Sequence, residues 1–191
     1  MRKVEKIINL STDKACAPIN LYGATKLVAD KLTTAANYNK GNSKTILSSV
    51  RYGNVINSRG SVIPIFQEMI KKNQTITLTD KNTTRFFLTI DEGVKFVINS
   101  LKIMSGGEIF IPKLKSIKIY DLINALNNKN KVKIIGMRPD EKIHEMLFTE
   151  DDSRNVIEAK NYYILFNSNE NLEIYLKKMK KNYKRINNFF N

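Results

Sequence analysis

Features that this sequence lacks narrow its class before any motif is considered. Its single cysteine, Cys16, can form no intramolecular disulfide, and we expect it to fill a loop or core position rather than act in redox chemistry. No run approaches the roughly 18 apolar residues that cross a membrane, and the apolar part of residues 1–10 is too short for a signal peptide. We therefore expect a cytoplasmic protein with no membrane partner. No Gly-x-Gly-x-x-Gly turn, which would hold a dinucleotide pyrophosphate, occurs among its eight glycines.

The strong positive charge raises the question of a nucleic-acid partner. Thirty-two lysines and arginines against 18 acidic residues give a net charge of +14, which would suit a phosphate-rich ligand. The basic residues are scattered among asparagines and isoleucines, however, and no nucleic-acid motif accompanies them. The densest basic run, residues 177–185, continues a helical spacing of Leu172, Tyr175, Leu176 and Met179. We interpret that run as a solvated helix face, with RNA binding as the alternative, and expect no nucleic-acid partner and no metal.

Apolar runs alternate with helical patterns along the chain, which is typical of an α/β sheet. With 42% hydrophobic residues the chain can bury a core. We expect strands at residues 4–10, 45–52, 75–79, 108–111, 132–135 and 162–166, with a short extended piece at 86–90. We expect helices at residues 21–38, 64–72, 91–104 with Asp91 as N-cap, 119–126 and 141–147.

The most informative stretch runs from Ser11 to Lys26. It sets an acid, an amine, a phenol and a second amine along a strand end, a loop and a helix start. Tyr22 and Lys26 stand one helical turn apart on one face, about 5–6 Å apart at Cβ, so their side chains can converge on one ligand. An ammonium close to Tyr22 stabilises its phenolate, so Tyr22 could exchange protons with a sugar hydroxyl. Taken alone this spacing would be accidental in so lysine-rich a chain, but it follows a buried strand, where open α/β sheets place their ligands.

Five ordered blocks, at residues 11–14, 18–26, 51–55, 59–64 and 138–145, give the chain a family resemblance. It resembles the extended short-chain dehydrogenase/reductase family, and within it the inverting UDP-N-acetylglucosamine 4,6-dehydratases of pseudaminic acid synthesis, in the polysaccharide biosynthesis protein family. Related membrane-anchored dehydratases carry a methionine where this chain has Tyr22, which favours the short, C5-epimerising subtype. The resemblance runs from about Val4 to about Phe166.

The resemblance implies that this sequence covers only part of the family fold. Family members begin with a strand, a Gly-rich turn and a helix, so this chain resembles the C-terminal part of an NAD(P)-binding Rossmann-fold sheet with a smaller substrate-binding lobe. A half-sheet would leave an open edge where further strands belong. We expect residues 1–60 to form part of the Rossmann domain, residues 61–166 the mixed lobe with returning Rossmann elements, and residues 167–191 a basic helical tail.

The resemblance also implies a substrate and a set of ligand residues. The expected cofactor is NADP, contacted by Thr12, Tyr22 and Lys26, and the expected substrate is UDP-N-acetylglucosamine. Substrate binding is expected from Arg51, Asn54, Ser61, Val62, Pro64, Phe66, Arg85, Arg138 and Glu141. Asn54 would contact the diphosphate, residues 61–66 would line the nucleotide, and Arg85, Arg138 and Glu141 would hold phosphate and ribose. Any one arginine alone would read as a surface ion pair.

Two residues of the last block need separate comment. Asp140 replaces the glycine usual in the family, and a carboxylate there would repel a diphosphate unless it turns outward. His144, the only histidine, is expected to be a hydrogen-bonded member of the helix at 141–147 rather than a base.

The implied mechanism assigns catalytic roles to Asp13, Lys14, Tyr22 and Lys26. Tyr22, supported by Lys26, would take the C4 hydroxyl proton while hydride leaves C4 for NADP. Asp13 and Lys14 would act as the acid/base pair that removes the C5 proton and helps to expel the C6 hydroxyl, and reprotonation from the other face would invert C5. Adjacent residues of a strand face opposite ways, so both can reach the sugar only if the chain turns there.

Other functions stay open at this stage. A nucleotide-sugar 4-epimerase of the same superfamily would share Tyr22 and Lys26, although it needs no C5 acid/base pair such as Asp13 and Lys14. A noncatalytic UDP-sugar-binding module is the second alternative, and Asp13 with Lys14 could then be a solvent-facing turn salt bridge. We expect the chain alone to be inactive, and the full-length form to be a homo-oligomer.

Overall fold

The α/β fold expected from the sequence is confirmed by a computed structural model, which describes residues 4–126, 129–179 and 183–186. The described chain groups into two compact units. Unit 1 contains Met1–Tyr52, Val94–Lys113 and Met146–Asn191, and unit 2 contains Gly53–Gly93 and Leu114–Glu145.

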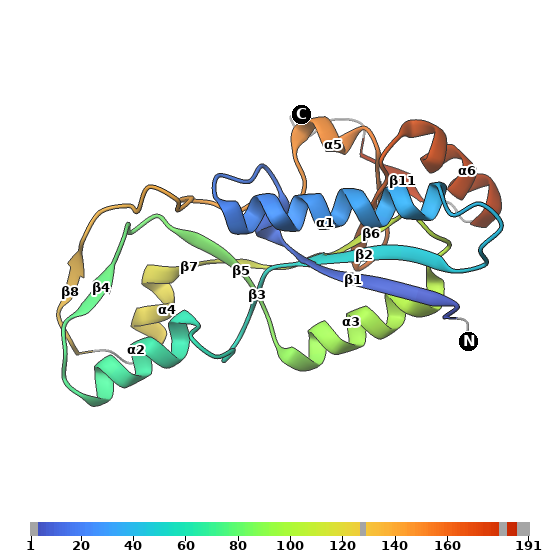
Figure 1. The fold of residues 1–191 in the computed structure, drawn as a ribbon. Coiled ribbons are helices and arrows are strands. Elements are labelled where there is room, and N and C mark those ends of the chain that lie inside the picture. The colour runs from blue at the N-terminus through green and yellow to red at the C-terminus, as the bar shows by residue number, and fades with distance from the viewer. Residues whose placement is uncertain (1–3, 127–128, 180–182, 187–191) are drawn as a thin grey trace. The chain divides into compact units, whose positions relative to one another are not determined.

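Unit 1 is built on a six-stranded sheet with the order β1-β2-β6-β10-β9-β11. The first three of these strands run parallel, and the others pair antiparallel. Helices α1 (Leu21–Tyr38) and α3 (Ile90–Ile103) lie on opposite faces of the parallel part (Figure 1). The strands are β1 (Lys6–Thr12), β2 (Ile46–Tyr52), β6 (Ile109–Pro112), β9 (Val156–Glu158), β10 (Tyr162–Leu165) and β11 (Lys184–Arg185).

The core of unit 1 forms where the sheet and the C-terminal helix meet. Val50, Phe110 and Ile164 are fully buried in the sheet, and Leu172 and Tyr175 of α6 (Asn169–Met179) pack into the same cluster. Each fully buried aliphatic side chain contributes on the order of 1.5–3 kcal/mol. Helix α6 is therefore part of the core, while its lysines face solvent. A short helix, α5 (Glu150–Ser153), carries a capping box between Thr149 and Asp152.

Helix α1 is joined to its sheet largely through polar side chains. Its buried positions are Gly23, Asp30, Thr34 and Asn37, spaced along one face. Asn37 accepts a hydrogen bond from the backbone N–H of Leu47 at 3.1 Å. Asn20 caps the helix by accepting from the N–H of Gly23 at 2.8 Å. Buried polar groups need partners in fixed positions, so the hydrogen bond between Asn37 and Leu47 helps to fix the position of α1 against the strands.

Unit 2 holds two small sheets and two helices around a second core. Its core cluster contains Phe66, Ile76, Leu78, Phe87, Ile119 and Ile123. One sheet has the order β3-β5-β7 and the other pairs β4 with β8 in parallel. The elements are β3 (Asn54–Val55), α2 (Val62–Lys71), β4 (Ile76–Leu78), β5 (Thr84–Leu88), β7 (Ser116–Lys118), α4 (Ile119–Ala125) and β8 (Val132–Ile134).

Two sequence predictions about helices are wrong. No helix forms at residues 141–147, because His144 instead bridges to Thr84 of β5, with Nδ1 and Oγ1 2.8 Å apart. Asp91 is not an N-cap, since α3 begins at Ile90 and Thr89 exchanges the capping hydrogen bonds with Glu92. The short strands β3, β7, β9 and β11 were not expected, and β11 lies in the basic run 177–185 that the sequence indicated as a helix face, because α6 ends at Met179 and Lys184–Arg185 pair with β9. The domain boundaries at residues 60 and 166 stay a prediction.

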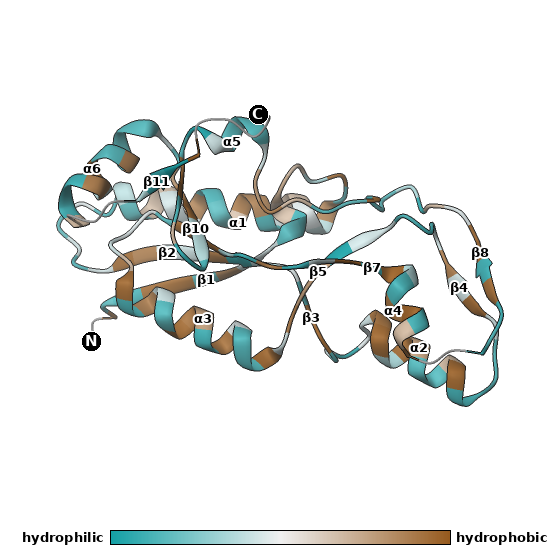
Figure 2. Cartoon of the chain, turned by 180° about the vertical axis from the view of Figure 1, so that it is seen from behind, coloured by the Kyte–Doolittle hydropathy of each residue, from teal (hydrophilic) through white to brown (hydrophobic). Residues whose placement is uncertain are grey.

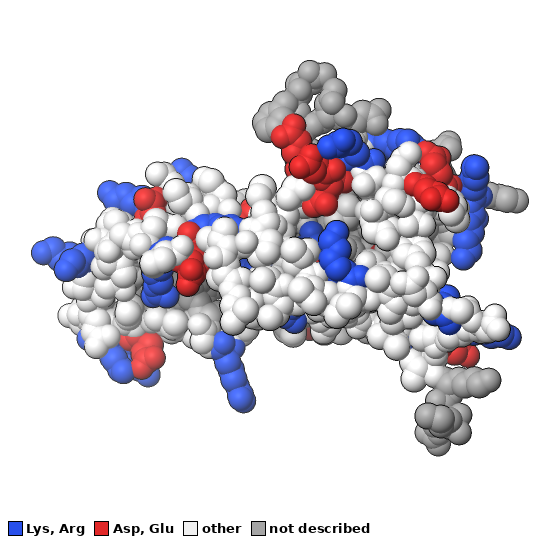
Figure 3. Space-filling view, turned by 45° about the horizontal axis from the view of Figure 1, so that its top comes forward, with Lys and Arg blue, Asp and Glu red and all other residues white. Residues whose placement is uncertain are grey.

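Charged side chains are dispersed over the face that Figure 3 shows. In Figure 3 lysine and arginine side chains stand singly or in small groups with acidic side chains between them. In the part of the chain that is described, no helix has both the length and the apolar character that membrane crossing requires.

The tyrosine that ends α1 predicts a loss of stability in alkali. Burial, together with the Glu108 carboxylate, raises the pKa of Tyr38 to about 12. In the unfolded chain the pKa of tyrosine is about 10. The contribution of Tyr38 to the free energy of unfolding is therefore complete below pH 10 and is lost as the pH rises from 10 to about 12. We expect the urea midpoint of Tyr38→Phe to fall less between these pH values than the parent's. Because 41% of Tyr38 is exposed, the difference will be modest. Equal falls would contradict the assignment.

Candidate functional site

The first set of predicted residues lies in unit 1, where β1 gives way to α1. Residues Asp13–Ala15 form a 3₁₀ helix, η1, directly after β1, so the chain does turn at this point. The Nζ of Lys14 lies 2.9 Å from Oδ1 of Asp13, and the Thr12 hydroxyl donates to the same oxygen at 2.8 Å. Asp13 and Lys14 therefore meet on one side of the backbone, which an extended strand would not allow.

The carboxylate of Asp13 is unusual in its burial. The side chain is fully buried, yet its second oxygen, Oδ2, has no hydrogen-bond partner among the described residues. A buried unsatisfied carboxylate oxygen costs on the order of 1–3 kcal/mol or more. Such a cost is typical of a group that acts on a ligand, because the ligand completes its hydrogen bonding.

Tyr22 and Lys26 share the first turns of α1. Tyr22 is 54% exposed, and the Nζ of Lys26 donates to the carbonyl oxygen of Leu10 in β1 at 3.2 Å. Tyr52, at the end of β2, is close enough that Tyr22 contributes to a raised pKa of Tyr52, for which burial is the larger cause. Sequence reasoning missed Tyr52 because its closeness to Tyr22 depends on the parallel pairing of β1 and β2.

Gly23 explains how α1 approaches the turn so closely. A Cβ at this position would lie 2.3 Å from the carbonyl oxygen of Lys14 and 3.0 Å from Cβ of Pro18. Only glycine fits, because the obstructing carbonyl belongs to the backbone and cannot rotate aside. The glycine between Tyr22 and Lys26 thus holds the first turn of α1 against η1.

Arg51 does not stand beside these groups as a free cation. It is 3% exposed, and its Nε and Nη2 donate to Oδ2 of Asp30 at 3.3 and 3.0 Å. Its Nη1 donates to the carbonyl oxygen of Leu147 at 2.9 Å. Asp30 also accepts from Ser11 at 2.8 Å and from Asn9 at 3.1 Å. In this structure Arg51 joins β2 to α1 through Asp30, and Asn9 and Ser11 join β1 to the same carboxylate.

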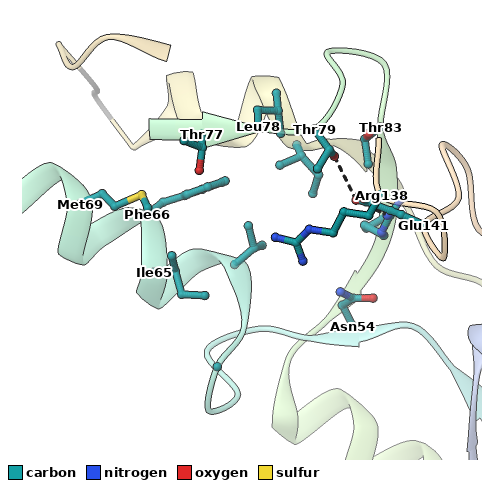
Figure 4. Close-up of a pocket in the computed structure, with 14 residues that line it drawn as sticks. Asn54, Ile65, Phe66, Met69, Thr77, Leu78, Thr79, Thr83, Arg138 and Glu141 are labelled. Atoms are coloured by element: carbon teal, nitrogen blue, oxygen red, sulfur yellow. Dashed lines mark hydrogen bonds and ion pairs between the residues drawn. The ribbon is translucent and has the colours of Figure 1, made fainter. Parts of the chain in front are cut away.

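The second set lies in unit 2 around a cavity of about 360 Å³ (Figure 4). This volume lies within the usual range for small-molecule sites. Among the predicted substrate residues, Asn54, Val62, Phe66, Arg85, Arg138 and Glu141 line it. Ser61 and Pro64 belong to the same α2 region but are not among the lining residues. Ile65, within the stretch 61–66 expected to line the nucleotide, is also a lining residue, and the lining residues that sequence reasoning missed are Gly60, Met69, Thr77, Leu78, Thr79, Thr83 and Ile119.

The cavity has an apolar end and a polar end. Ile65, Phe66 and Met69 of α2 form the apolar end, and Arg138 extends its guanidinium toward the middle (Figure 4). No described residue is a hydrogen-bond partner of that guanidinium, which leaves it available to an anion. Asp140 is exposed and does not line the cavity.

Arg85 and Glu141 are bound to one another at the polar end. Nη2 of Arg85 lies 3.2 Å from Oε1 of Glu141, which also accepts from the Thr79 hydroxyl at 3.0 Å. Nη1 of Arg85 donates to the carbonyl oxygens of Thr84 and Ile143 at 2.7 and 3.1 Å. The other oxygen of Glu141, Oε2, and the Thr83 hydroxyl have no partner among the described residues. Arg85 therefore orients Glu141, and Glu141 can accept hydrogen bonds from ligand hydroxyls.

The chain is similar in sequence and fold to known proteins. The chain is 51% identical over 163 residues to the inverting UDP-N-acetylglucosamine 4,6-dehydratase of Campylobacter jejuni. The matched segment covers 85% of this chain and 49% of that protein. It is 39% identical over 167 residues to a UDP-glucose 4-epimerase of Rickettsia bellii, covering 85% of this chain and 49% of the epimerase. The X-ray structure of Pen from Bacillus thuringiensis shares 42% identity and a TM-score of 0.80, over 85% of this chain and 53% of Pen.

The chain thus spans about half the length of the proteins that it matches. More distant solved structures with the same fold hold NAD. The sequence pattern of the polysaccharide biosynthesis protein family matches residues 1–167. This chain belongs to that family of extended short-chain dehydrogenases/reductases and is related to the UDP-N-acetylglucosamine 4,6-dehydratases.

Proposed function

We propose that this chain supplies the proton-transfer groups and the nucleotide-sugar pocket of a UDP-N-acetylglucosamine 4,6-dehydratase that inverts C5. The observation that carries the proposal is the pairing of Lys14 with the buried Asp13 at the turn after β1. A carboxylate and an ammonium that share one hydrogen bond can take up and release a proton at a single substrate carbon. The product would be the L-configured 4-keto-6-deoxy sugar, and the reaction would be the first step toward pseudaminic acid.

Tyr22 would accept the C4 hydroxyl proton, and Lys26 would favour its phenolate. Asp13 and Lys14 would then remove the C5 proton, which the adjacent ketone makes acidic, and assist loss of the C6 hydroxyl as water. The unpartnered Oδ2 of Asp13 is the oxygen with free capacity for this exchange. Bound NADP would accept a hydride from C4 and return it to C6, and Thr12, Tyr22 and Lys26 are the residues that would hold it.

The pocket of unit 2 would bind the UDP part of the substrate. Arg138 would pair with the diphosphate, because its guanidinium is the cation that the described residues leave without a partner. Glu141, oriented by Arg85 and Thr79, would accept hydrogen bonds from the ribose hydroxyls. Phe66 and Met69 would pack on the base. A homo-oligomer of the full-length form stays a prediction.

UDP binding tests the pocket directly. We expect this chain alone to bind UDP weakly in calorimetry, and Arg138→Ala to weaken binding about 10- to 100-fold, because a charge-assisted hydrogen bond contributes about 1.5–3 kcal/mol. Arg154→Ala is the matched control, since Arg154 lies on the surface of unit 1 in an exposed pair with Asp151. No UDP binding by the parent, or equal losses in the two variants, would refute the pocket.

A 4-epimerase is the second candidate, and the Rickettsia bellii relative favours it. An epimerase leaves the C5–H bond intact, whereas a dehydratase must break it. Incorporation of solvent deuterium at C5 therefore separates the two functions.

A further inference from the structure

A second cavity, of about 310 Å³, lies within unit 1, between the C-terminal end of α1, the loop before β6 and helix α6. Its volume is in the usual range for small-molecule sites. Helix α6 begins at Asn169, whereas the match to the family pattern ends at residue 167. One wall of this cavity therefore comes from a part of the chain that the family pattern does not describe, and we call it the α6 cavity.

The inner part of the α6 cavity is aromatic. Phe166 and Tyr175 both line it, both are buried, and their ring centroids lie 5.0 Å apart. Ile174 also lines the cavity and is exposed, so it lies at the mouth. Figure 2 shows apolar and polar residues alternating along α6. Aromatic rings of this kind offer a broad apolar surface on which a ligand ring can pack.

The opposite wall holds polar groups that are open to a ligand. Asn37 is only 7% exposed, and its Oδ1 accepts from the N–H of Leu47 at 3.1 Å. Its Nδ2 donates to no group in the described part of the chain, and the same is true of the Ser105 hydroxyl beside it. A Cβ at Gly106 would lie 2.3 Å from Oδ1 of Asn37, so glycine is needed there for Asn37 to take this position. Because a buried amide without a partner is unfavourable, this wall points to a ligand that accepts hydrogen bonds.

The charges around the α6 cavity disfavour a charged ligand of either sign. Glu108 is fully buried behind the loop, where its oxygens accept from the N–H groups of Ser105 and Gly106 at 2.7 Å each. Burial and then this carboxylate raise the pKa of Tyr38, another lining residue, to about 12, so the negative field extends to the cavity wall. That field opposes an anion, and the exposed ammonium of Lys178 at the mouth opposes a cation. Amides and hydroxyls both donate and accept, which suits the hydroxyls of a neutral ligand.

We propose that the α6 cavity binds the ring of a neutral sugar, a pyranose, at a site separate from the pocket of unit 2. The apolar C–H face of the ring packs on Phe166 and Tyr175. The ring hydroxyls accept from Nδ2 of Asn37 and pair with the Ser105 hydroxyl. A wholly apolar ligand is the competing occupant, and it would leave the Asn37 amide unpaired. The proposal does not rest on the substrate proposed for unit 2.

NMR titration of this chain tests the proposal. N-acetylglucosamine and galactose would each be added with and without UDP, and the signals of the Asn37 side-chain amide followed. We expect these signals to shift equally in both conditions with a dissociation constant of about 1–10 mM, since a single sugar ring makes few contacts. Ser105→Leu, which fills the cavity and leaves Asn37 unchanged, should raise that dissociation constant at least about tenfold.

Two further variants sharpen the test. Ser43→Leu is the matched control, because Ser43 is exposed and outside the cavity, and it should leave the titration unchanged. Asn37→Asp keeps the acceptor for Leu47 but loses the donor Nδ2, so it should also weaken binding at least about tenfold, as followed at the backbone amide of Ser105. If Asn37→Asp does not fold, Ser105→Leu still decides the question.

Three results would overturn the proposal. One is the absence of any shift up to about 100 mM of either sugar. Another is an equal effect of Ser105→Leu and Ser43→Leu on the titration. The third is a larger shift of the Asn37 amide with inorganic phosphate, which would reveal an anion site, or with benzene, which would reveal an apolar one. Binding of UDP to unit 2 enters none of these results, so failure here is separate from failure of the proposed function.

Discussion

Asp30→Ala is expected to destabilise the chain by about 3–5 kcal/mol in urea unfolding. Asp30 is fully buried and joins three strand residues, Asn9, Ser11 and Arg51, to α1. Its removal leaves the Arg51 guanidinium buried without a counter-charge, and that desolvation is the main cost. A loss of this size is a large share of the stability of a domain, so the variant should melt early or fail to accumulate.

Two comparisons isolate the cause of this loss. Asp151→Ala breaks a pair whose side chains are 89% and 77% exposed, and we expect less than about 1 kcal/mol from it. The double variant Asp30→Leu/Arg51→Met replaces the buried pair by apolar groups and should recover much of the stability. A cost for Asp30→Ala as small as that for Asp151→Ala would mean that solvent reaches the network in solution.

Lys14→Ala and Tyr22→Phe are expected to lower dehydratase turnover by about 10²–10⁴-fold each, in this chain fused to the uncovered half of the Campylobacter jejuni relative. The two losses should differ in kind. Tyr22→Phe removes the acceptor of the C4 proton and should slow the first oxidation. Lys14→Ala should allow oxidation but block elimination of water, which single-turnover absorbance of the reduced cofactor would reveal.

The parent fusion in heavy water gives the stereochemical test. Its product should carry deuterium at C5 with inverted configuration. Lys31→Ala, an exposed change on α1 outside the proposed catalytic set, should act like the parent. Retention at C5, or a Lys14→Ala enzyme as fast as its parent, would exclude the proposed roles of Asp13 and Lys14.

Local signals explain which elements could be predicted from the sequence. Helix α1 has the predicted bounds, Leu21–Tyr38, because the Asn20 cap and the start of the 3.6-residue pattern are both signals of the local sequence. The helix expected at residues 141–147 fails because its polar residues have distant partners. Glu141 bonds to Thr79 and Arg85, and His144 bonds to Thr84. Those contacts arise only after the chain has folded.

The candidate site shows the same limit. The turn after β1 could be anticipated from the neighbouring acid and amine, but the burial of Asp13 could not. Arg51 is expected from the family resemblance to bind the substrate, and nothing near it in the sequence reveals that Asp30 lies against it in the fold. A weak sequence signal for the threonines of the cavity does exist. Thr77 and Thr79 alternate with buried Ile76 and Leu78, and this alternation indicates that the threonines lie on the face of the strand opposite the core.

The interleaving of the two units has a consequence for how such proteins diversify. Unit 2 is made of two separate stretches, Gly53–Gly93 and Leu114–Glu145, set between stretches of unit 1. Exchange of the whole pocket between two genes therefore also carries Val94–Lys113 of unit 1, and a crossover in either stretch would mix two parental pockets. Substitution inside the pocket avoids this exchange of unit 1 residues, provided that every intermediate still folds. Family members with different substrates should thus differ at scattered pocket positions rather than by transplanted blocks.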